Sequence, residues 1–143
     1  MAIGIDTSFL VAVEYLGHTP VQPSRELLDR FLQSGEVLAL NPDVLSEFIH
    51  TVTDPKRIVS PLSMSEAIER AEYWWSADEV VAVYPTNLST RLTLEWLRQF
   101  QLGRKRLRDT TLAASYRVAG VNRIVTLNKR DFEVFGVFDL LEP

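Results

Sequence analysis

Short, largely apolar runs alternate along the chain with longer stretches in which apolar residues recur every three or four positions. A short continuous apolar run is typical of a strand that is buried on both faces, whereas the longer spacing predicts a helix with one buried side. The runs that predict strands are Ala2–Ile5, Val37–Leu40, Val80–Tyr84, Arg123–Thr126 and, as a possible fifth, Val137–Leu141.

Between these runs, the apolar spacing and the polar residues at its borders predict six helices. They are Thr7–Leu16, ended by Gly17; Pro23 to Gly35; Asn41 to Val52; Ser63 or Ser65 to Trp75; Asn87–Leu102, ended by Gly103; and Asp109–Ala119, ended by Gly120. The side chains expected to face the core from the second helix are Leu27, Leu28, Phe31 and Leu32. Ser63 and Glu66 have the spacing of a capping box.

Strands that alternate with helices in this way predict a three-layer α/β/α domain with a central parallel sheet of four to five strands. The 143 residues are enough for one domain, so we expect residues 1–143 to fold as a single unit. Ligands of such sheets bind at the carboxyl ends of the strands, near the point where the strand order reverses.

Four acidic residues are predicted at that edge of the sheet. Asp6 follows the first strand, and Glu47 lies in the helix after the second. Asp109 opens the sixth helix, and Asp131 comes just past the fourth strand. Crowded like charges raise one another's pKa, and a divalent cation removes that conflict. Because the chain has no cysteine and only two histidines, its carboxylate oxygens favour Mg²⁺ or Mn²⁺.

A structural role is the alternative for each acid taken singly. An Asp after a strand often caps a helix, and both Asp6 and Asp109 suit that role. Glu47 is different, because apolar Val44 and Phe48 on the same helix place it near the buried side. Capping does not account for all four acids together, so we favour a shared site.

Composition excludes several other classes of protein. The absence of cysteine rules out a disulfide scaffold, a Cys-ligated metal cluster and a cysteine nucleophile. No apolar run approaches the ~18 residues of a membrane span, and the first residues do not resemble a secretion signal. We therefore expect a soluble, cytoplasmic protein with no membrane contact.

The net charge of −4 argues against a nucleic-acid partner, but its distribution does not. Residues 98–130 contain nine basic residues and a single acid, whereas the remainder contains six basic and eighteen acidic residues. The acidic average therefore belongs to the other parts of the chain, and the cationic segment contains Asp109 and ends just before Asp131.

Several segments, in this order along the chain, resemble the motifs of the PIN-domain ribonucleases. They are Ile5–Leu10, Val44–Phe48, Arg108–Ala114, Val125–Phe132 and the closing stretch Phe138–Pro143. Each motif alone is weak, but the ordered set covers nearly the whole chain. The compact length is similar to that of the VapC-type toxins of toxin–antitoxin pairs.

The resemblance implies a role for each acid. Asp6 and Asp109 would be primary metal ligands, with Glu47 completing the site directly or through water. Family members differ in the fourth position, and here we favour Asp131 over Asn128. The supporting polar residues in the same motifs are Thr7, Ser8 and Asn128.

The implied activity is Mg²⁺- or Mn²⁺-dependent hydrolysis of RNA by a toxin whose partners are a small antitoxin and a second copy of the chain. Basic residues next to the candidate ligands would contact RNA phosphates. They are Arg104, Lys105, Arg106, Arg108, Lys129 and Arg130. We expect at least one of the adjacent aromatic residues Tyr73, Trp74 and Trp75 on a partner surface.

Other functions fit the residues less well. A phosphatase of the haloacid-dehalogenase type needs an Asp where Ser8 stands, and a receiver domain needs an acceptor Asp where the chain has Tyr84 and Pro85. Glu47 and His50 have the spacing of half a di-iron site, but no second copy exists. A catalytically weak PIN-like RNA-binding or assembly module remains the alternative.

Overall fold

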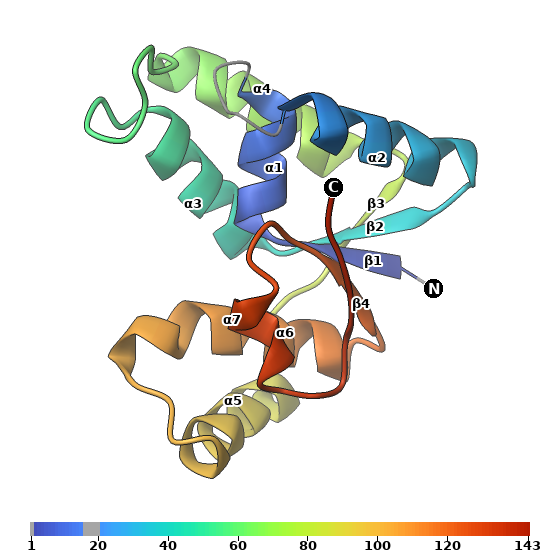
Figure 1. Cartoon of the computed structure of the whole chain (residues 1–143), viewed down its shortest axis with the longest axis vertical. Helices are drawn as coiled ribbons and strands as arrows, with labels where there is room; N and C mark the ends of the chain where they lie inside the picture. The colour runs from blue at the N-terminus through green and yellow to red at the C-terminus, as the bar shows by residue number, and fades with distance from the viewer. Residues whose placement is uncertain (1, 16–20) are drawn as a thin grey trace.

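A computed structural model of the chain describes residues 2–15 and 21–143. Its centre is a five-stranded sheet in which every pair of neighbours is parallel (Figure 1). The strands are β1 (Ala2–Ile5), β2 (Val37–Leu40), β3 (Val80–Ala82), β4 (Arg123–Val125) and β5 (Asp139–Leu141), in the order β3-β2-β1-β4-β5.

The strand order places β1 between β2 and β4, where the direction of the winding reverses. Gly4 of β1 lies opposite Ala39 of β2 and Ile124 of β4. The pairing continues past the end of β1, because the backbone N–H of Asp6 donates to the carbonyl of Val125 at 3.1 Å. The carboxyl ends of β1 and β4 therefore meet at the position where open parallel sheets bind ligands.

Helices cover both faces of the sheet, which confirms the predicted α/β architecture (Figure 1). One layer contains α1 (Thr7–Glu14), α2 (Val21–Gln33), α3 (Pro42–Val52) and α4 (Met64–Ser76). The other contains α5 (Asn87–Gln99), the short 3-10 helix η1 (Arg104–Arg106), α6 (Leu107–Val118) and α7 (Arg130–Glu133). No helix among the described residues is long and apolar enough to cross a bilayer.

Local sequence signals explain where several helices begin and end. The side chain of Asn41 accepts a hydrogen bond from the backbone N–H of Asp43 and so caps α3. Ser63 and Glu66 form the predicted capping box at the start of α4. Gly35 and Gly120 adopt the positive φ that a helix-ending turn requires, as predicted.

Other predicted boundaries were wrong. The chain leaves α5 after Gln99 through Gln101, whose φ is +52°, so Gly103 is not the residue that ends the helix. α6 begins at Leu107, two residues before the predicted start at Asp109. The predicted end of the first helix at Leu16, with its stop at Gly17, lies outside the described residues, and α1 ends at Glu14.

The edges of the molecule also differ from the prediction. β3 lies at the edge of the sheet and its Val81 is exposed, so this strand is not buried on both faces. Leu32 of α2 is likewise exposed, although the spacing predicted it to face the core. α7 was not predicted, because four residues are too few to show a helical period.

A close contact between α6 and the central strand β1 holds the carboxyl edge of the sheet in place. The fully buried Tyr116 of α6 lies against Gly4, and its hydroxyl donates to the carbonyl oxygens of Ile5 and Ala39 at 2.7 and 3.1 Å. A Cβ atom on Gly4 would lie 2.7 Å from two ring carbons of Tyr116. Only glycine therefore fits here without displacing the ring.

Replacing Gly4 with alanine should lower the free energy of unfolding by about 1–3 kcal/mol, because an overpacked core must move to accept the methyl group. Gly103→Ala is the matched control, since a Cβ there meets no atom within 4 Å and φ is −89°. Urea denaturation of both variants measures the effect. Equal stability of the two variants would contradict this account of the β1–α6 contact.

Candidate active site

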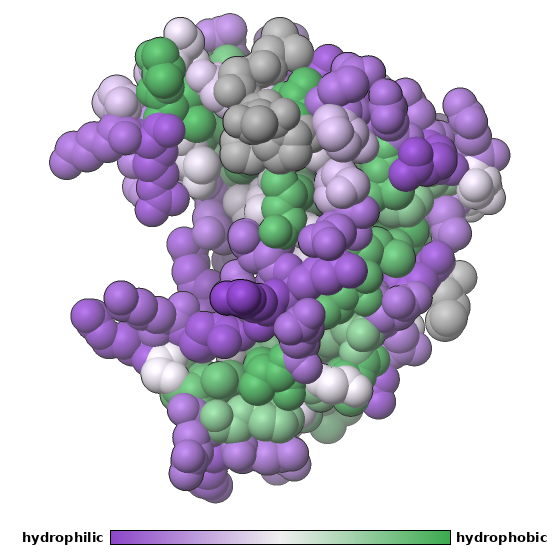
Figure 2. Space-filling model, in the orientation of Figure 1, coloured by the Kyte–Doolittle hydropathy of each residue, from purple (hydrophilic) through white to green (hydrophobic). Residues whose placement is uncertain are grey.

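A cavity of about 630 Å³ opens at the carboxyl edge of the sheet. Figure 2 shows the molecule hollowed on one side, between the part that contains α3 and the part that contains α6, with hydrophilic side chains at the rim. All four predicted acids line the cavity, together with Thr7, Ser8 and Asn128. The remaining lining residues are Val11, Thr51, Lys105, Arg108 and Leu127.

Asp6 is the most buried of the four acids, and two hydroxyl groups orient its carboxylate. Ser8 and Thr126 both donate to Asp6 Oδ2, at 2.8 and 2.7 Å. Each hydroxyl oxygen in turn accepts a backbone N–H, from Leu127 and Asn128 respectively. These bonds tie the end of β1 to the loop after β4.

Burial raises the pKa of Asp6, against the opposing effect of the hydrogen bonds from Thr126 and Ser8. Asp6 stands at the N-cap position of α1 but makes no side-chain capping bond. Asp109 lies inside the first turn of α6, where Arg106 is the N-cap residue. Capping therefore explains neither of these two acids.

Glu47 reaches the cavity from α3. Thr7 donates a hydrogen bond to Glu47 Oε2 at 3.0 Å, which connects the start of α1 to the middle of α3. His50, three residues later, is exposed and does not line the cavity. The E-x-x-H spacing of Glu47 and His50 therefore does not form a pair of ligands for one ion.

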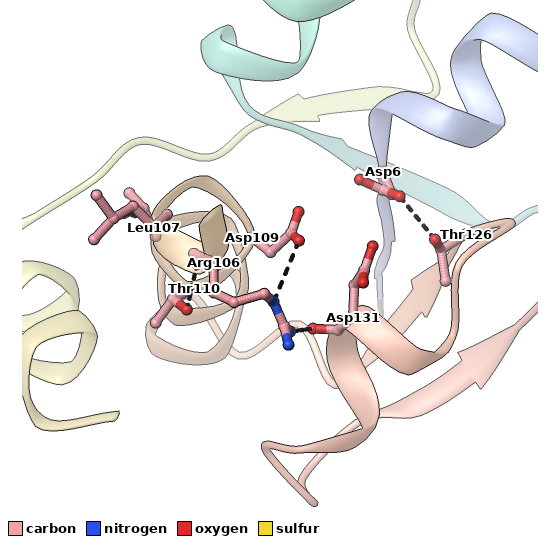
Figure 3. Close-up of polar contacts among 8 residues, drawn as sticks. Asp6, Arg106, Leu107, Asp109, Thr110, Thr126 and Asp131 are labelled. Carbon is pink, nitrogen blue, oxygen red and sulfur yellow. Dashed lines mark hydrogen bonds and ion pairs between the residues drawn. The ribbon is translucent and has the colours of Figure 1, made fainter. Parts of the chain in front are cut away.

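Asp109 and Asp131 face each other across the cavity from α6 and α7 (Figure 3). Arg106 lies beside both residues. Its Nε is 3.7 Å from Asp109 Oδ2, and its Nη2 donates a hydrogen bond to the main-chain carbonyl of Asp131. Asp109, Asp131 and Asp6 thus come from three elements that meet only in the folded chain.

Burial raises the pKa of Asp109 to about 7, and the negative charges of Asp131, Asp6 and Glu47 contribute to the rise. The positive charge of Arg106 opposes it. Ionised carboxylates at this cavity therefore repel one another more strongly than one nearby arginine can offset.

Oxygen donors of this kind fit a hard divalent cation such as Mg²⁺ or Mn²⁺, and such an ion would relieve the repulsion that, after burial, contributes to the raised pKa of Asp109. Within the described part of the chain, no three acidic or histidine side chains form a ready-made metal cage. The residues that could hold an ion from the walls of the cavity are Asp6, Glu47, Asp109 and Asp131.

The predicted cationic residues fall into different environments. Lys105 and Arg108 line the cavity, and Arg104 and Arg130 are exposed. Lys129 lies 3.6 Å from the carboxylate of Glu142. Arg106 differs from all of these, since it is turned toward Asp109 and Asp131.

The sequence did not single out Thr126 or Thr51. Thr126 is fully buried and donates to Asp6, and Thr51 lines the cavity one helical turn after Glu47. The available signal for Thr126 was its position directly after β4, at the same sheet edge as Asp6. The signal for Thr51 was its spacing of four residues from Glu47, which puts both side chains on one side of α3.

The three adjacent aromatic residues of α4 have different surroundings. Trp74 is buried, and its indole N–H donates to Glu14 at 2.9 Å. Trp75 contacts the ring of Tyr84 edge to face. Tyr73 is three-quarters exposed and is thus the most accessible of the three.

The fold is similar to solved structures of VapC toxins. VapC20 of Mycobacterium tuberculosis, described as a sarcin-ricin loop cleaving toxin, has a TM-score of 0.74 and 19% identity over 99% of this chain and 100% of its own. VapBC-1 of nontypeable Haemophilus influenzae has a TM-score of 0.70 and 13% identity over 99% of this chain and 98% of that chain. VapBC2 of Rickettsia felis, solved with promoter DNA, has a TM-score of 0.69 and 17% identity over 100% and 99%.

The chain has the PIN-domain fold of the VapC toxins. No protein-family model matches the sequence, and no curated protein is similar to it in sequence. Because the identities are below 20%, the likeness establishes the PIN-domain fold and its parallel sheet, and the chemistry must be argued from the residues in the cavity.

Asp109→Asn should stabilise the metal-free protein at neutral pH. The folded-state pKa of about 7 lies above the usual value, so the folded protein retains a proton that the unfolded chain has lost between about pH 4 and 7. The stability of the wild type relative to the variant should fall as pH rises through this range, by about 1–2 kcal/mol after solvent screening. Urea denaturation in EDTA at pH 5 and pH 8 measures the difference.

Glu133→Gln on the exposed side of α7 is the control for this comparison, and it should show no such pH dependence. Equal stability of Asp109→Asn and the wild type at pH 8 would show that burial and the neighbouring carboxylates do not disfavour the ionised form of Asp109 as described.

Proposed function

We propose that the chain is a metal-dependent ribonuclease that hydrolyses phosphodiester bonds of RNA. The observation that carries the proposal is the convergence of four carboxylates on one cavity whose wall also contains Lys105 and Arg108. The similar fold of a toxin described as cleaving the sarcin-ricin loop supports the same class of substrate.

Asp6 and Asp109 would hold Mg²⁺ or Mn²⁺, with Glu47 and Asp131 completing the set of ligands. When bound, such an ion lowers the pKa of water and neutralises charge on a phosphate. The residues of the chain orient the ligands: Ser8 and Thr126 fix the Asp6 carboxylate, and Thr7 fixes Glu47. Asn128 is at the same rim, where its amide can contact substrate or support Asp131.

Positive side chains at the cavity would bind the RNA backbone. Lys105 and Arg108 are best placed for the phosphate next to the cut, because both line the cavity. The exposed Arg104 and Arg130, together with Lys129, would add further contacts to the RNA backbone. Contacts to phosphates give affinity without sequence preference, so they do not specify which RNA is cut.

We further propose that the protein is the cytoplasmic toxin of a toxin–antitoxin pair and that it forms a homodimer. The similar structures include VapBC and FitAB assemblies. Two apolar hollows suit partner chains: one of about 370 Å³ between α3 and α4, lined by Leu45, Ile49 and Trp75, and one of about 160 Å³ beside Leu28 and Tyr73.

Asp6→Asn and Asp109→Asn should each abolish metal-dependent cleavage, with a loss of about 100-fold or more in rate. The protein should stay folded, since an amide oxygen can accept the same hydroxyl bonds at position 6. Cleavage of total cellular RNA with Mg²⁺ or Mn²⁺, and its loss in EDTA, provides the measurement. Glu133→Gln, with its carboxylate outside the cavity, is the control and should cleave normally.

Retained metal-dependent cleavage in both variants would contradict the assignment of the site. Binding of RNA by the wild type without cleavage, in the presence of either ion, would favour an RNA-binding module in place of a nuclease.

Lys105→Ala and Arg108→Ala should raise KM for RNA several-fold with little change in kcat. Each should also reduce the slope of log affinity against log salt by about 0.7, the value for one contact to a single strand. Arg30→Ala, an exposed arginine on α2, is the matched control. An unchanged salt slope in both cavity variants would exclude a direct phosphate contact.

A further inference from the structure

Arg106 lies where a residue that binds RNA phosphates would be poorly placed. Only 27% of its side chain is exposed, and its guanidinium fits between the first turn of α6 and α7 (Figure 3). Nη2 donates to the main-chain carbonyl of Asp131, and Nε lies 3.7 Å from Asp109 Oδ2. One side chain thus contacts the two residues that supply carboxylates from different elements.

The position of Arg106 itself is fixed by its backbone. The N–H of Arg106 donates to the carbonyl of Gly103, and the carbonyl of Arg106 accepts a hydrogen bond from the hydroxyl of Thr110. The guanidinium therefore extends from a well-defined turn where η1 meets α6. Because the backbone of Arg106 is held in this way, its guanidinium keeps a fixed position relative to α6 and can hold Asp131 in place.

The short helix α7, which the guanidinium contacts, needs support from another part of the fold. α7 contains only four residues, and a single helical turn has little stability of its own. Phe132, which is buried, anchors the apolar side of α7. The bond from Arg106 to the Asp131 carbonyl attaches the polar side, next to the carboxylate that faces the cavity.

Arg106 also places a positive charge next to two acidic residues of the cavity. Asp109 and Asp131 carry like charges on opposite walls, and a guanidinium between their elements lowers the cost of bringing them together. Its Nε is buried and has no hydrogen-bond partner among the described residues. Its contact with Asp109 Oδ2 at 3.7 Å is therefore an ion pair and not a hydrogen bond.

We propose that Arg106 is a positioning residue of the metal site, which holds α7 against α6 so that Asp131 and Asp109 can share one cation. This proposal rests on the metal site of the proposed function. It replaces, for Arg106 alone, the phosphate contact that the sequence indicates. The remaining basic residues keep that role.

Arg106→Ala should weaken binding of Mn²⁺ about tenfold or more, measured by calorimetry without RNA, as is typical when a residue that supports metal ligands is removed. It should lower kcat for RNA cleavage at limiting Mn²⁺ and leave KM for RNA unchanged. Arg104→Ala, an exposed cation two residues away, is the matched control and should leave Mn²⁺ affinity unchanged. A raised KM with normal Mn²⁺ affinity in Arg106→Ala would overturn the proposal.

Arg106→Lys separates the charge from the hydrogen bond. Lysine keeps a cation near Asp109 but lacks the planar guanidinium that reaches the Asp131 carbonyl, so it should recover less than half of the lost affinity. Full recovery of Mn²⁺ affinity in Arg106→Lys would overturn the positioning of α7. This variant also keeps the buried charge, and it provides the test if Arg106→Ala does not fold.

A double-mutant cycle tests whether Arg106 acts through Asp131. In an Asp131→Asn background, Arg106→Ala should cause little further loss of Mn²⁺ affinity, because the carboxylate that Arg106 positions is already gone. Equal losses in the two backgrounds would overturn the proposal. Wild-type protein that binds Mn²⁺ but does not cleave RNA would contradict the ribonuclease alone, whereas wild-type protein that binds no Mn²⁺ would overturn both proposals.

Discussion

Four carboxylates converge on one partly buried cavity, and the rest of the fold must offset their mutual repulsion. Asp6, Glu47, Asp109 and Asp131 approach the same cavity from four segments of the chain, and burial together with the charges of the other three acids raises the pKa of Asp109 to about 7. Such an arrangement costs stability unless a cation joins it. A bound cation, as proposed above, would relieve this cost.

Contacts in the sheet and in the core beneath it hold the acidic residues together against this repulsion. Parallel pairing of β1 with β2 and β4 brings the segments that carry Asp6, Glu47 and Asp131 to one edge, where Asp109 of α6 joins them. Tyr116, packed on Gly4, holds the carbonyls of Ile5 and Ala39 just beneath that edge. The hydroxyls of Ser8 and Thr126 then orient Asp6. The favourable contacts of the core thus offset the unfavourable repulsion among the carboxylates that line the cavity.

The positions of the acidic residues could be predicted from the sequence, but most of the contacts that hold them in place could not. Asp6 and Glu47 could be located because buried strands precede them, and strand ends in a parallel sheet share an edge. The role of Arg106 could not be predicted, because its contacts span 25 residues to a helix too short to show a pattern. Likewise, nothing local indicates that Gln101, not Gly103, makes the left-handed turn after α5.

The position of a bound ion is the direct test of the proposed metal site. Crystals grown with Mn²⁺ allow its location from anomalous scattering. We predict a peak in the cavity, at coordination distance from carboxylate oxygens of both Asp6 and Asp109, about 2.0–2.3 Å as is usual for oxygen ligands of small divalent cations. A map with no peak in the cavity, or with Mn²⁺ bound only at other acidic residues, would contradict the proposed metal site.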